Sequence, residues 1–269
     1  MSCPELPEQF VIKQDFFSMR KTFSIHTFAM NNKRNLNRNK NFINAMRNIK
    51  PNTKIASYKT KMLSMRGMVG YPRIRMYYRP NAKKSKEYLA GTANAQGSWK
   101  LSEMRDMRYM IKCGRDIFHI QEKKEGIIAN TVKHEFGPDA FKMDFEIFKE
   151  IKSKKNKTPK PTKKRILFVT VRKKFGKGKL TTMIRFYDET NNLINDTYAK
   201  RITTFGNVRS LLLSKFFVQN KRYPLKKNNP LLSGYIIGLI AYIFSNNEMQ
   251  SLSRGVNKGT RFLKWMIKK

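Results

Sequence analysis

Hydrophobic positions repeat with two different periods along this chain. Apolar residues recur at helical spacing within residues 99–112, which follow Ser98 and precede Gly114, and again within residues 139–152. A serine before such a stretch and a glycine after it are typical of the two ends of a helix. The pattern therefore predicts one helix over residues 99–112 and a second over residues 139–152.

The pattern changes after residue 161, where short β-branched and apolar runs are separated by turn residues. These runs are Ile166–Val171, Leu180–Tyr187 and Leu193–Ile202. Gly176 and Gly178 lie in the first gap, and Asp188–Asn192 fill the second. We expect a three-stranded antiparallel meander, followed by a helix within Val208–Val218.

The most apolar stretch of the chain is Pro230–Phe244. At about fifteen residues it is shorter than the roughly 20 residues that cross a bilayer as a helix. Gly234 and Gly238 would let a helix pack closely on a sheet. The stretch therefore predicts a buried core helix, and a membrane anchor is the alternative.

Residues 1 to about 95 show little periodicity and few apolar side chains, so we expect them to become ordered mainly against a partner. The run 152–164 contains many lysines with Pro159 and Pro161, which is typical of an extended linker. Two parts are predicted: a basic extension over residues 1–160 that carries the two helices, and a compact domain over residues 161–269.

The charge of the chain is extreme: 57 Lys and Arg against 18 Asp and Glu give a formal net charge of +39. Basic clusters occur along the whole length, which predicts a polyanion on several sides of the protein. RNA fits best, because no zinc-finger, basic-zipper or helix-turn-helix pattern for DNA is present. Ribosomal proteins occupy such an environment.

The candidate RNA-binding residues fall into two groups. Basic residues in extended or turn segments would contact phosphate, and a C-terminal glycine motif would leave backbone amides free to meet phosphate at the start of a helix. The alternatives are a β-hairpin or coil on a neighbouring protein for residues 70–80, and an ordinary loop before the last helix for the glycine motif. The candidates are Arg34, Arg38, Arg73, Arg75, Arg79, Lys177, Lys179, Arg201, Arg209, Arg254, Gly255, Lys258, Gly259, Arg261 and Lys264.

Candidate catalytic groups are sparse. The three histidines lack the paired spacing of a metal site, and the two cysteines are too few for a zinc site. Asp188, Glu189 and Asp196 are the carboxylates that a metal-dependent nuclease would use, but acids are common at turns. We therefore expect no catalysis, no metal, no cofactor and no small-molecule substrate.

The C-terminal part resembles the ribosomal RNase-H-like proteins, especially the eleventh protein of the small ribosomal subunit. That family runs strand, strand, strand, helix, and then Lys-Gly-Pro-Gly-X-Gly-Arg at a helix start. Arg254, Gly255, Asn257 and Gly259 occupy the Lys and the three Gly positions of this motif. The eighteenth protein of the large subunit has a similar topology and also ends soon after its last helix. The resemblance implies an α+β fold with an antiparallel meander.

The composition also bears on localisation. Lys, Asn, Ile, Phe and Tyr are abundant and Met reaches 15, as an AT-rich genome and a mitochondrial codon table would produce. An AT-rich nuclear genome would give a similar composition. We therefore expect a structural protein of the mitochondrial ribosome, in the small subunit, with rRNA and neighbouring ribosomal proteins as partners and no membrane. The alternatives are a mitochondrial membrane-complex subunit anchored by residues 230–244, and an RNA-processing nuclease or maturase.

Overall fold

The computed structural model describes residues 6–15, 22–27, 42, 44, 46, 53–61, 73–79, 86–96, 108–123, 142–151, 162–176, 179–204, 215–220 and 236–241. Twelve strands lie within these residues. They are β1 Gln9–Gln14, β2 Thr22–Thr27, β3 Lys54–Lys61, β4 Arg73–Tyr78, β5 Tyr88–Gln96, β6 Arg108–Cys113, β7 Asp116–Glu122, β8 Lys142–Ile151, β9 Thr162–Gly176, β10 Lys179–Tyr187, β11 Leu193–Thr204 and β12 Lys215–Asn220.

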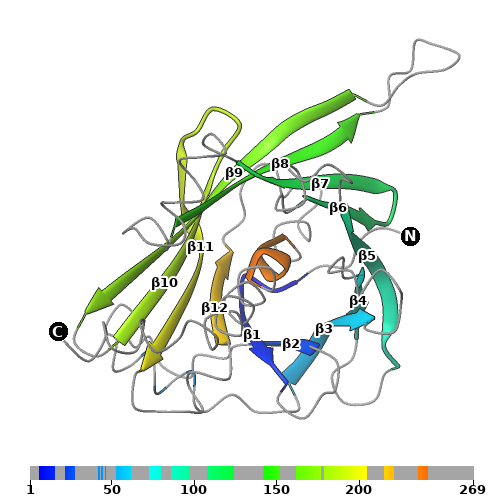
Figure 1. Cartoon of the computed structure of the whole chain (residues 1–269). Coiled ribbons are helices and arrows are strands. Elements are labelled where there is room, and N and C mark those ends of the chain that lie inside the picture. Colours follow the sequence, from blue (N-terminus) through cyan, green and yellow to red (C-terminus); the bar gives the residue numbers. More distant parts are fainter. Residues whose placement is uncertain are drawn as a thin grey trace, which may run out of the picture.

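The strands form one closed antiparallel barrel in which each strand pairs with its neighbours in sequence (Figure 1). The barrel closes where β1 pairs with β12, with Gln9 opposite Gln219 and Lys13 opposite Lys215. The expected α+β fold and the resemblance to ribosomal RNase-H-like proteins are therefore wrong. The expected N-terminal extension is also wrong as a description of fold, because it supplies β1 to β8 of the barrel.

Alternation along the strands separates an apolar interior from a polar exterior. Phe10 and Ile12 of β1 are buried with Ile74 and Met76 of β4, and all four belong to one core cluster that extends around the barrel. Side chains between such positions point to the opposite face of the sheet. One face of every strand therefore contributes to a common core.

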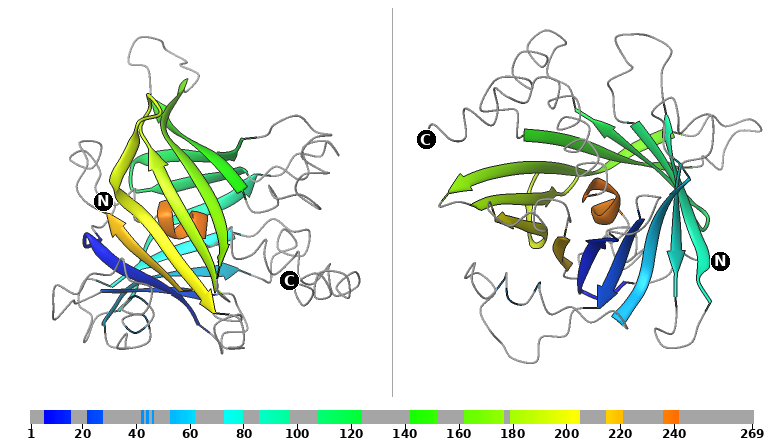
Figure 2. Two further views of the ribbon diagram at one scale, coloured as in Figure 1. Left: turned by 90° about the vertical axis from the view of Figure 1, so that its left-hand side faces the viewer. Right: turned by 60° about the horizontal axis from the view of Figure 1, so that its bottom comes forward.

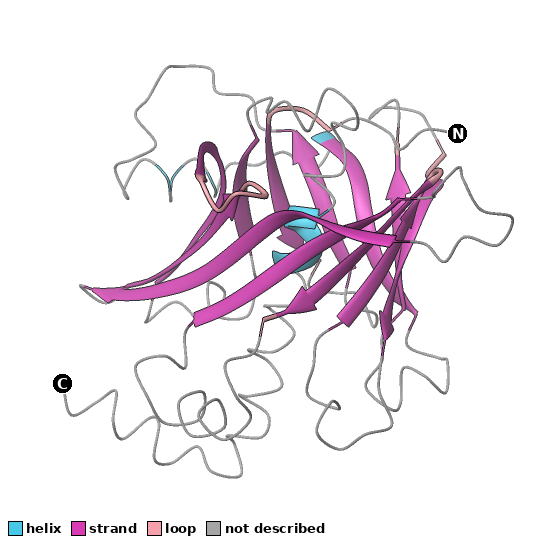
Figure 3. Cartoon of the chain, turned by 90° about the horizontal axis from the view of Figure 1, so that it is seen from above, coloured by secondary structure: helices cyan, strands magenta, loops and turns pink. Residues whose placement is uncertain are grey.

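A helix lies inside the barrel (Figures 2 and 3). Residues 236–241 are helical, and Ile236, Ile237, Leu239, Ile240 and Ala241 are fully buried in the core cluster. This confirms the predicted buried helix for the described part of Pro230–Phe244. Among the described residues, no helix is both long enough and apolar enough to span a membrane.

Gly238 explains how this helix fits. A Cβ atom at Gly238 would lie 2.3 Å from Oη of Tyr58, and Tyr58 on β3 is itself fully buried. The helix backbone therefore approaches the Tyr58 ring so closely that only glycine fits at position 238.

The two helices predicted in the first 160 residues are wrong where the structure describes them. Residues 108–112 belong to β6, in which Tyr109, Ile111 and Cys113 alternate as buried positions. Residues 142–151 form β8, in which Phe145 and Ile147 are fully buried. Both segments have the two-residue period of strands, and pairing with neighbours on both sides stabilises them as such.

The predicted meander is confirmed. β9 pairs with β10, and β10 pairs with β11, all antiparallel. The turn before β11 is held by the Asp188 carboxylate, and Asn191 adopts a φ of 67° there. The helix expected within Val208–Val218 is wrong for residues 215–218, which lie in β12, and the rest of that segment lies outside the described residues.

The linker predicted over residues 152–164 lies outside the described residues except for its last three. On either side of it, β8 and β9 pair along their lengths from Lys142 opposite Arg172 to Ile151 opposite Thr162. The predicted boundary near residue 160 therefore falls between two strands that are hydrogen-bonded to each other.

Candidate nucleic-acid interface

The barrel wall made by β3 to β6 presents basic residues on its outer surface. Ile74 and Met76 of β4 fill the interior and have no exposed surface, so Arg73, Arg75 and Tyr77 face outward. Arg73 is exposed and Arg75 is half-buried. Strand alternation thus turns a run of mixed residues into one apolar and one basic face.

The strand register aligns further cations with these arginines. Arg75 lies opposite Lys59 on β3 and opposite Thr92 on β5, and Thr92 lies opposite Lys112 on β6. We call Lys59, Arg73, Arg75, Tyr77 and Lys112 the basic face. Like charges directly opposite each other destabilise a sheet by roughly 0.2–1 kcal/mol. Stability of the sheet therefore does not account for the pairing of Arg75 with Lys59.

One carboxylate neutralises the edge of the basic face. Glu87 accepts a hydrogen bond from Lys54 at 2.8 Å, forms a second ion pair with Lys59, and lies 3.7 Å from Arg79. Burial alone would raise the pKa of the Glu87 carboxyl, but hydrogen bonds and charge attraction from Lys54 and Lys59 outweigh it and lower the pKa to about 2. Lys59 is also 4.5 Å from the centre of the Tyr77 ring.

The other cations of the basic face lack such a partner. Arg73, Arg75 and Lys112 form no ion pair with any residue that the structure describes. Cations on β9 differ, because Arg172 pairs with Asp144 at 2.6 Å and Arg165 pairs with Glu146 at 3.2 Å. Within the described part of the chain, the wall of β3 to β6 therefore carries positive charge without a counter-charge, whereas ion pairs neutralise Arg165 and Arg172 on β9.

The arrangement suits an extended polyanion. Arg73 and Arg75 are two residues apart on one strand, which separates them by about 7 Å along the sheet. Lys112 lies two strands away from Arg75, at about 10 Å. Arginine binds phosphate oxygens through two parallel N–H bonds, so each cation can contact a different phosphate group.

The structure places five of the predicted binding residues. Arg73 and Arg75 come together on the basic face, and Arg79 belongs to the Glu87 cluster. Lys179 is half-buried at the start of β10. Arg201 lies opposite Thr182 on the interior side of β11, is 5% exposed and is 5.8 Å from the Phe216 ring centre.

The other predicted binding residues lie outside the described part of the chain. They are Arg34, Arg38, Lys177, Arg209, Arg254, Gly255, Lys258, Gly259, Arg261 and Lys264.

Sequence reasoning missed Lys59 and Lys112. Lys59 follows buried Tyr58 in the alternating segment Lys54–Lys61, and this two-residue period was the available signal. Lys112 lies within the helix predicted over residues 99–112, and that prediction does not place it on the outer face of a strand.

The carboxylates considered for a nuclease are placed only in part. The Asp188 carboxylate accepts hydrogen bonds from the Thr190 hydroxyl at 2.7 Å and from the Asn192 amide at 2.8 Å. These bonds, with the Thr190 hydroxyl contributing most, lower the pKa of Asp188 to about 2. Glu189 pairs with Lys164 at 2.8 Å, and nothing is described of the Asp196 side chain. Among the described residues, no three His, Cys, Asp or Glu side chains gather as a metal site.

Comparisons with known proteins find no matching family model, no matching curated protein and no matching solved structure.

Proposed function

We propose that this protein binds RNA through the basic face and serves as a structural component of a ribonucleoprotein particle. The observation that carries the proposal is the set of three cations, Arg73, Arg75 and Lys112, that form no ion pair with the described residues on a wall where like charges face each other. Phosphate groups would supply the missing counter-charge.

The charge of the whole chain supports the same partner. A net charge of +39 on 269 residues is far beyond what solubility requires and repels itself in the folded state. An RNA that surrounds the protein would remove that repulsion. A ribosome is such a surrounding, and the composition, rich in Lys, Asn, Ile and Met, favours a mitochondrial one. We propose rRNA and adjacent ribosomal proteins as its partners there.

The salt dependence of RNA binding tests the basic face. The probe is a mixed-sequence RNA hairpin, and the variant is Arg73→Gln combined with Arg75→Gln. The logarithm of the binding constant falls with the logarithm of salt by about 0.7–0.9 per phosphate contact. The double variant should therefore bind more weakly at low salt, with a slope that is shallower by about 1.4–1.8.

A matched control separates a defined face from charge in general. Lys163 and Lys174 are exposed cations on β9 that form no ion pair with the described residues. Lys163→Gln combined with Lys174→Gln removes the same charge and should change the slope less. An equal change in both variants would contradict a role for the basic face. Sedimentation of the tagged protein with a ribosomal subunit at high salt would test the choice of particle.

A further inference from the structure

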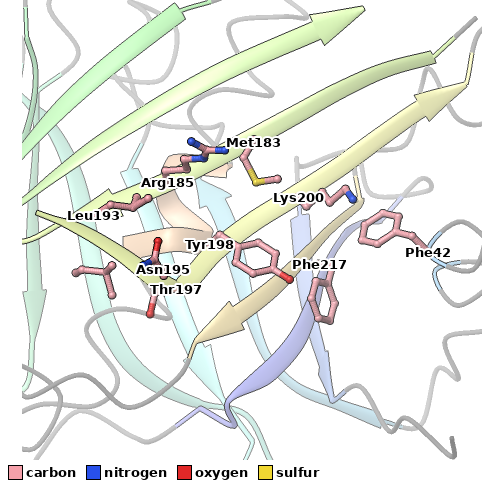
Figure 4. A pocket seen from close by; sticks show the side chains of 10 residues that line it. Phe42, Met183, Arg185, Leu193, Asn195, Thr197, Tyr198, Lys200 and Phe217 are labelled. Carbon is pink, nitrogen blue, oxygen red and sulfur yellow. The ribbon is translucent and has the colours of Figure 1, made fainter. Parts of the chain in front are cut away.

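A second surface, on the outside of β10 to β12, combines aromatic rings with cations. A cavity of about 270 Å³ opens there (Figure 4). Ten residues line it, and we call six of them the aromatic groove: Phe42, Met183, Arg185, Tyr198, Lys200 and Phe217. In Figure 1, β10 and β11 lie on the side of the barrel opposite β4 and β5, so the groove and the basic face point in different directions.

The floor of the groove follows from the pattern of β12. Phe216 and Val218 fill the interior, so Phe217 between them faces outward. Phe217 is nevertheless only 2% exposed, because Phe42 from a helical segment packs edge-on against it with ring centres 6.0 Å apart. Tyr198 lies beside Phe217 at 6.3 Å and is half-buried. Phe42 and Phe217 thus pack against each other, and the Tyr198 ring beside them keeps part of its surface accessible.

Two cations border these rings. Lys200 lies opposite Phe217, and Arg185 lies opposite Tyr198. The Lys200 ammonium is 5.1 Å from the Phe42 ring centre, and burial lowers its pKa. Neither cation forms an ion pair with the described residues, and none of the described residues that line the groove is a carboxylate. Among the described residues, the groove therefore offers the half-buried ring of Tyr198 together with the positive charge of Arg185 and Lys200.

This combination matches one class of ligand. Unpaired bases stack on aromatic side chains while cations hold the adjoining phosphate, and a base within a duplex is not free to do so. The volume is below the roughly 300 Å³ at which pockets begin to enclose drug-sized molecules. It is therefore suited to one base with the backbone outside, and not to a longer segment.

We infer that the aromatic groove binds one unpaired nucleotide of the RNA, with its base against Tyr198 and its phosphate at Arg185 and Lys200. The inference rests on the proposed function and adds a preference for unpaired over paired RNA. Because the groove and the basic face lie on opposite walls, RNA would contact the barrel on two sides.

The test compares two RNA hairpins that differ in one unpaired, bulged nucleotide, with the full-length protein and fluorescence anisotropy. Stacking of one base changes affinity by about 5- to 150-fold. The wild-type protein should therefore prefer the bulged hairpin by a factor in this range. Tyr198→Leu, which keeps an apolar side chain over Phe217, should abolish the preference. Tyr198→Phe, which keeps the ring, should retain it.

Control variants separate failure of this inference from failure of the proposed function. Tyr88 is an exposed tyrosine on β5, so Tyr88→Leu should leave the preference intact. Tyr198→Leu should still bind the paired hairpin with the wild-type salt slope, which shows that the variant is folded. If the wild-type protein bound both hairpins equally and in a salt-sensitive way, the inference about the aromatic groove would be wrong, and the proposed RNA binding by the basic face would remain supported. Failure to bind either hairpin would overturn both.

Discussion

Glu87 shows how one residue limits the charge that the basic face can offer. Its carboxylate draws Lys54 and Lys59 together and lies near Arg79, and it also accepts a hydrogen bond from Ser57 at 3.4 Å. These cations are therefore committed within the protein. RNA would compete with Glu87 for them, whereas Arg73 and Arg75 have no described partner to give up.

Substitution of Glu87 should have a pH-dependent cost. The folded-state pKa of about 2 lies below the ordinary value of 4.5, so the unfolded state binds more protons between these values. The stabilisation is therefore present above pH 4.5 and is lost as the pH falls towards 2. Glu87→Gln should lower the free energy of unfolding by about 1–3 kcal/mol at neutral pH. Urea denaturation should show this difference shrinking across that acidic range.

Glu8 provides the control for this measurement. It is exposed, and its side chain forms no ion pair with the described residues. Glu8→Gln should change the free energy of unfolding little at any pH. A cost of Glu87→Gln that stayed constant through the acidic range would contradict the ion-pair cluster.

Single residues also show what a sequence can and cannot reveal. Gly114 was expected to end a helix, a position that requires a positive φ, and its φ is indeed 58°. It instead lies in the two-residue turn of the β6–β7 hairpin, where Cys113 pairs with Asp116. Helix ends and tight hairpins both demand a glycine of this kind, so the residue predicts the backbone conformation but not the element.

The same ambiguity affects whole elements. Phe145 and Phe148 are three residues apart, which places them on one face of a helix but on opposite faces of a strand. In β8, Phe145 is fully buried, and Phe148 lies opposite Arg165 beyond a register shift. Pairing with β7 and β9 makes this segment a strand and not a helix. Those partner strands lie outside the segment, so the segment's own residues do not reveal the outcome. β9 to β11 were predictable because their β-branched residues favour strands and the residues between them favour turns, so both signals indicate the same hairpins.

Substitution of Gly238 in the helix at residues 236–241 should change the stability of the protein in the direction opposite to the usual one. Replacing glycine by alanine inside a helix normally stabilises it by roughly 0.5–1 kcal/mol. Gly238→Ala should instead destabilise the protein by about 1–3 kcal/mol, since the new methyl group would overlap Tyr58. Chemical denaturation of the variant provides the measurement.

A second substitution identifies the contact responsible. In a Tyr58→Leu background the ring is gone, so Gly238→Ala should cost much less or become stabilising. If the losses of unfolding free energy caused by Gly238→Ala and Tyr58→Leu were additive in the double variant, the helix would not pack against Tyr58 inside the barrel.

At the scale of the molecule, closure of the barrel could not be predicted from the sequence. The closing contact joins Gln9 to Gln219, whose side chains hydrogen-bond at 2.8 Å across 210 residues of chain. The low apolar content of residues 1 to 95 suggested a segment that depends on a partner. Alternation on a curved sheet uses few apolar residues efficiently, because each strand needs only one buried face. The charge, in contrast, could be counted directly, and it underlies the proposal of RNA as partner.

Closure predicts that the barrel unfolds as one unit, and two identical changes on distant strands test this. Ile12 on β1 and Ile184 on β10 are both fully buried, so Ile12→Val and Ile184→Val each delete one buried methylene. Each should lower the free energy of unfolding by about 0.5–1.5 kcal/mol. In a cooperative barrel, either variant speeds exchange of the slowest amides in both β1–β2 and β9–β11 by the same factor, about 2- to 12-fold. If the chain is divided near residue 160, each variant will affect only its own side, and hydrogen-exchange mass spectrometry resolves the two outcomes.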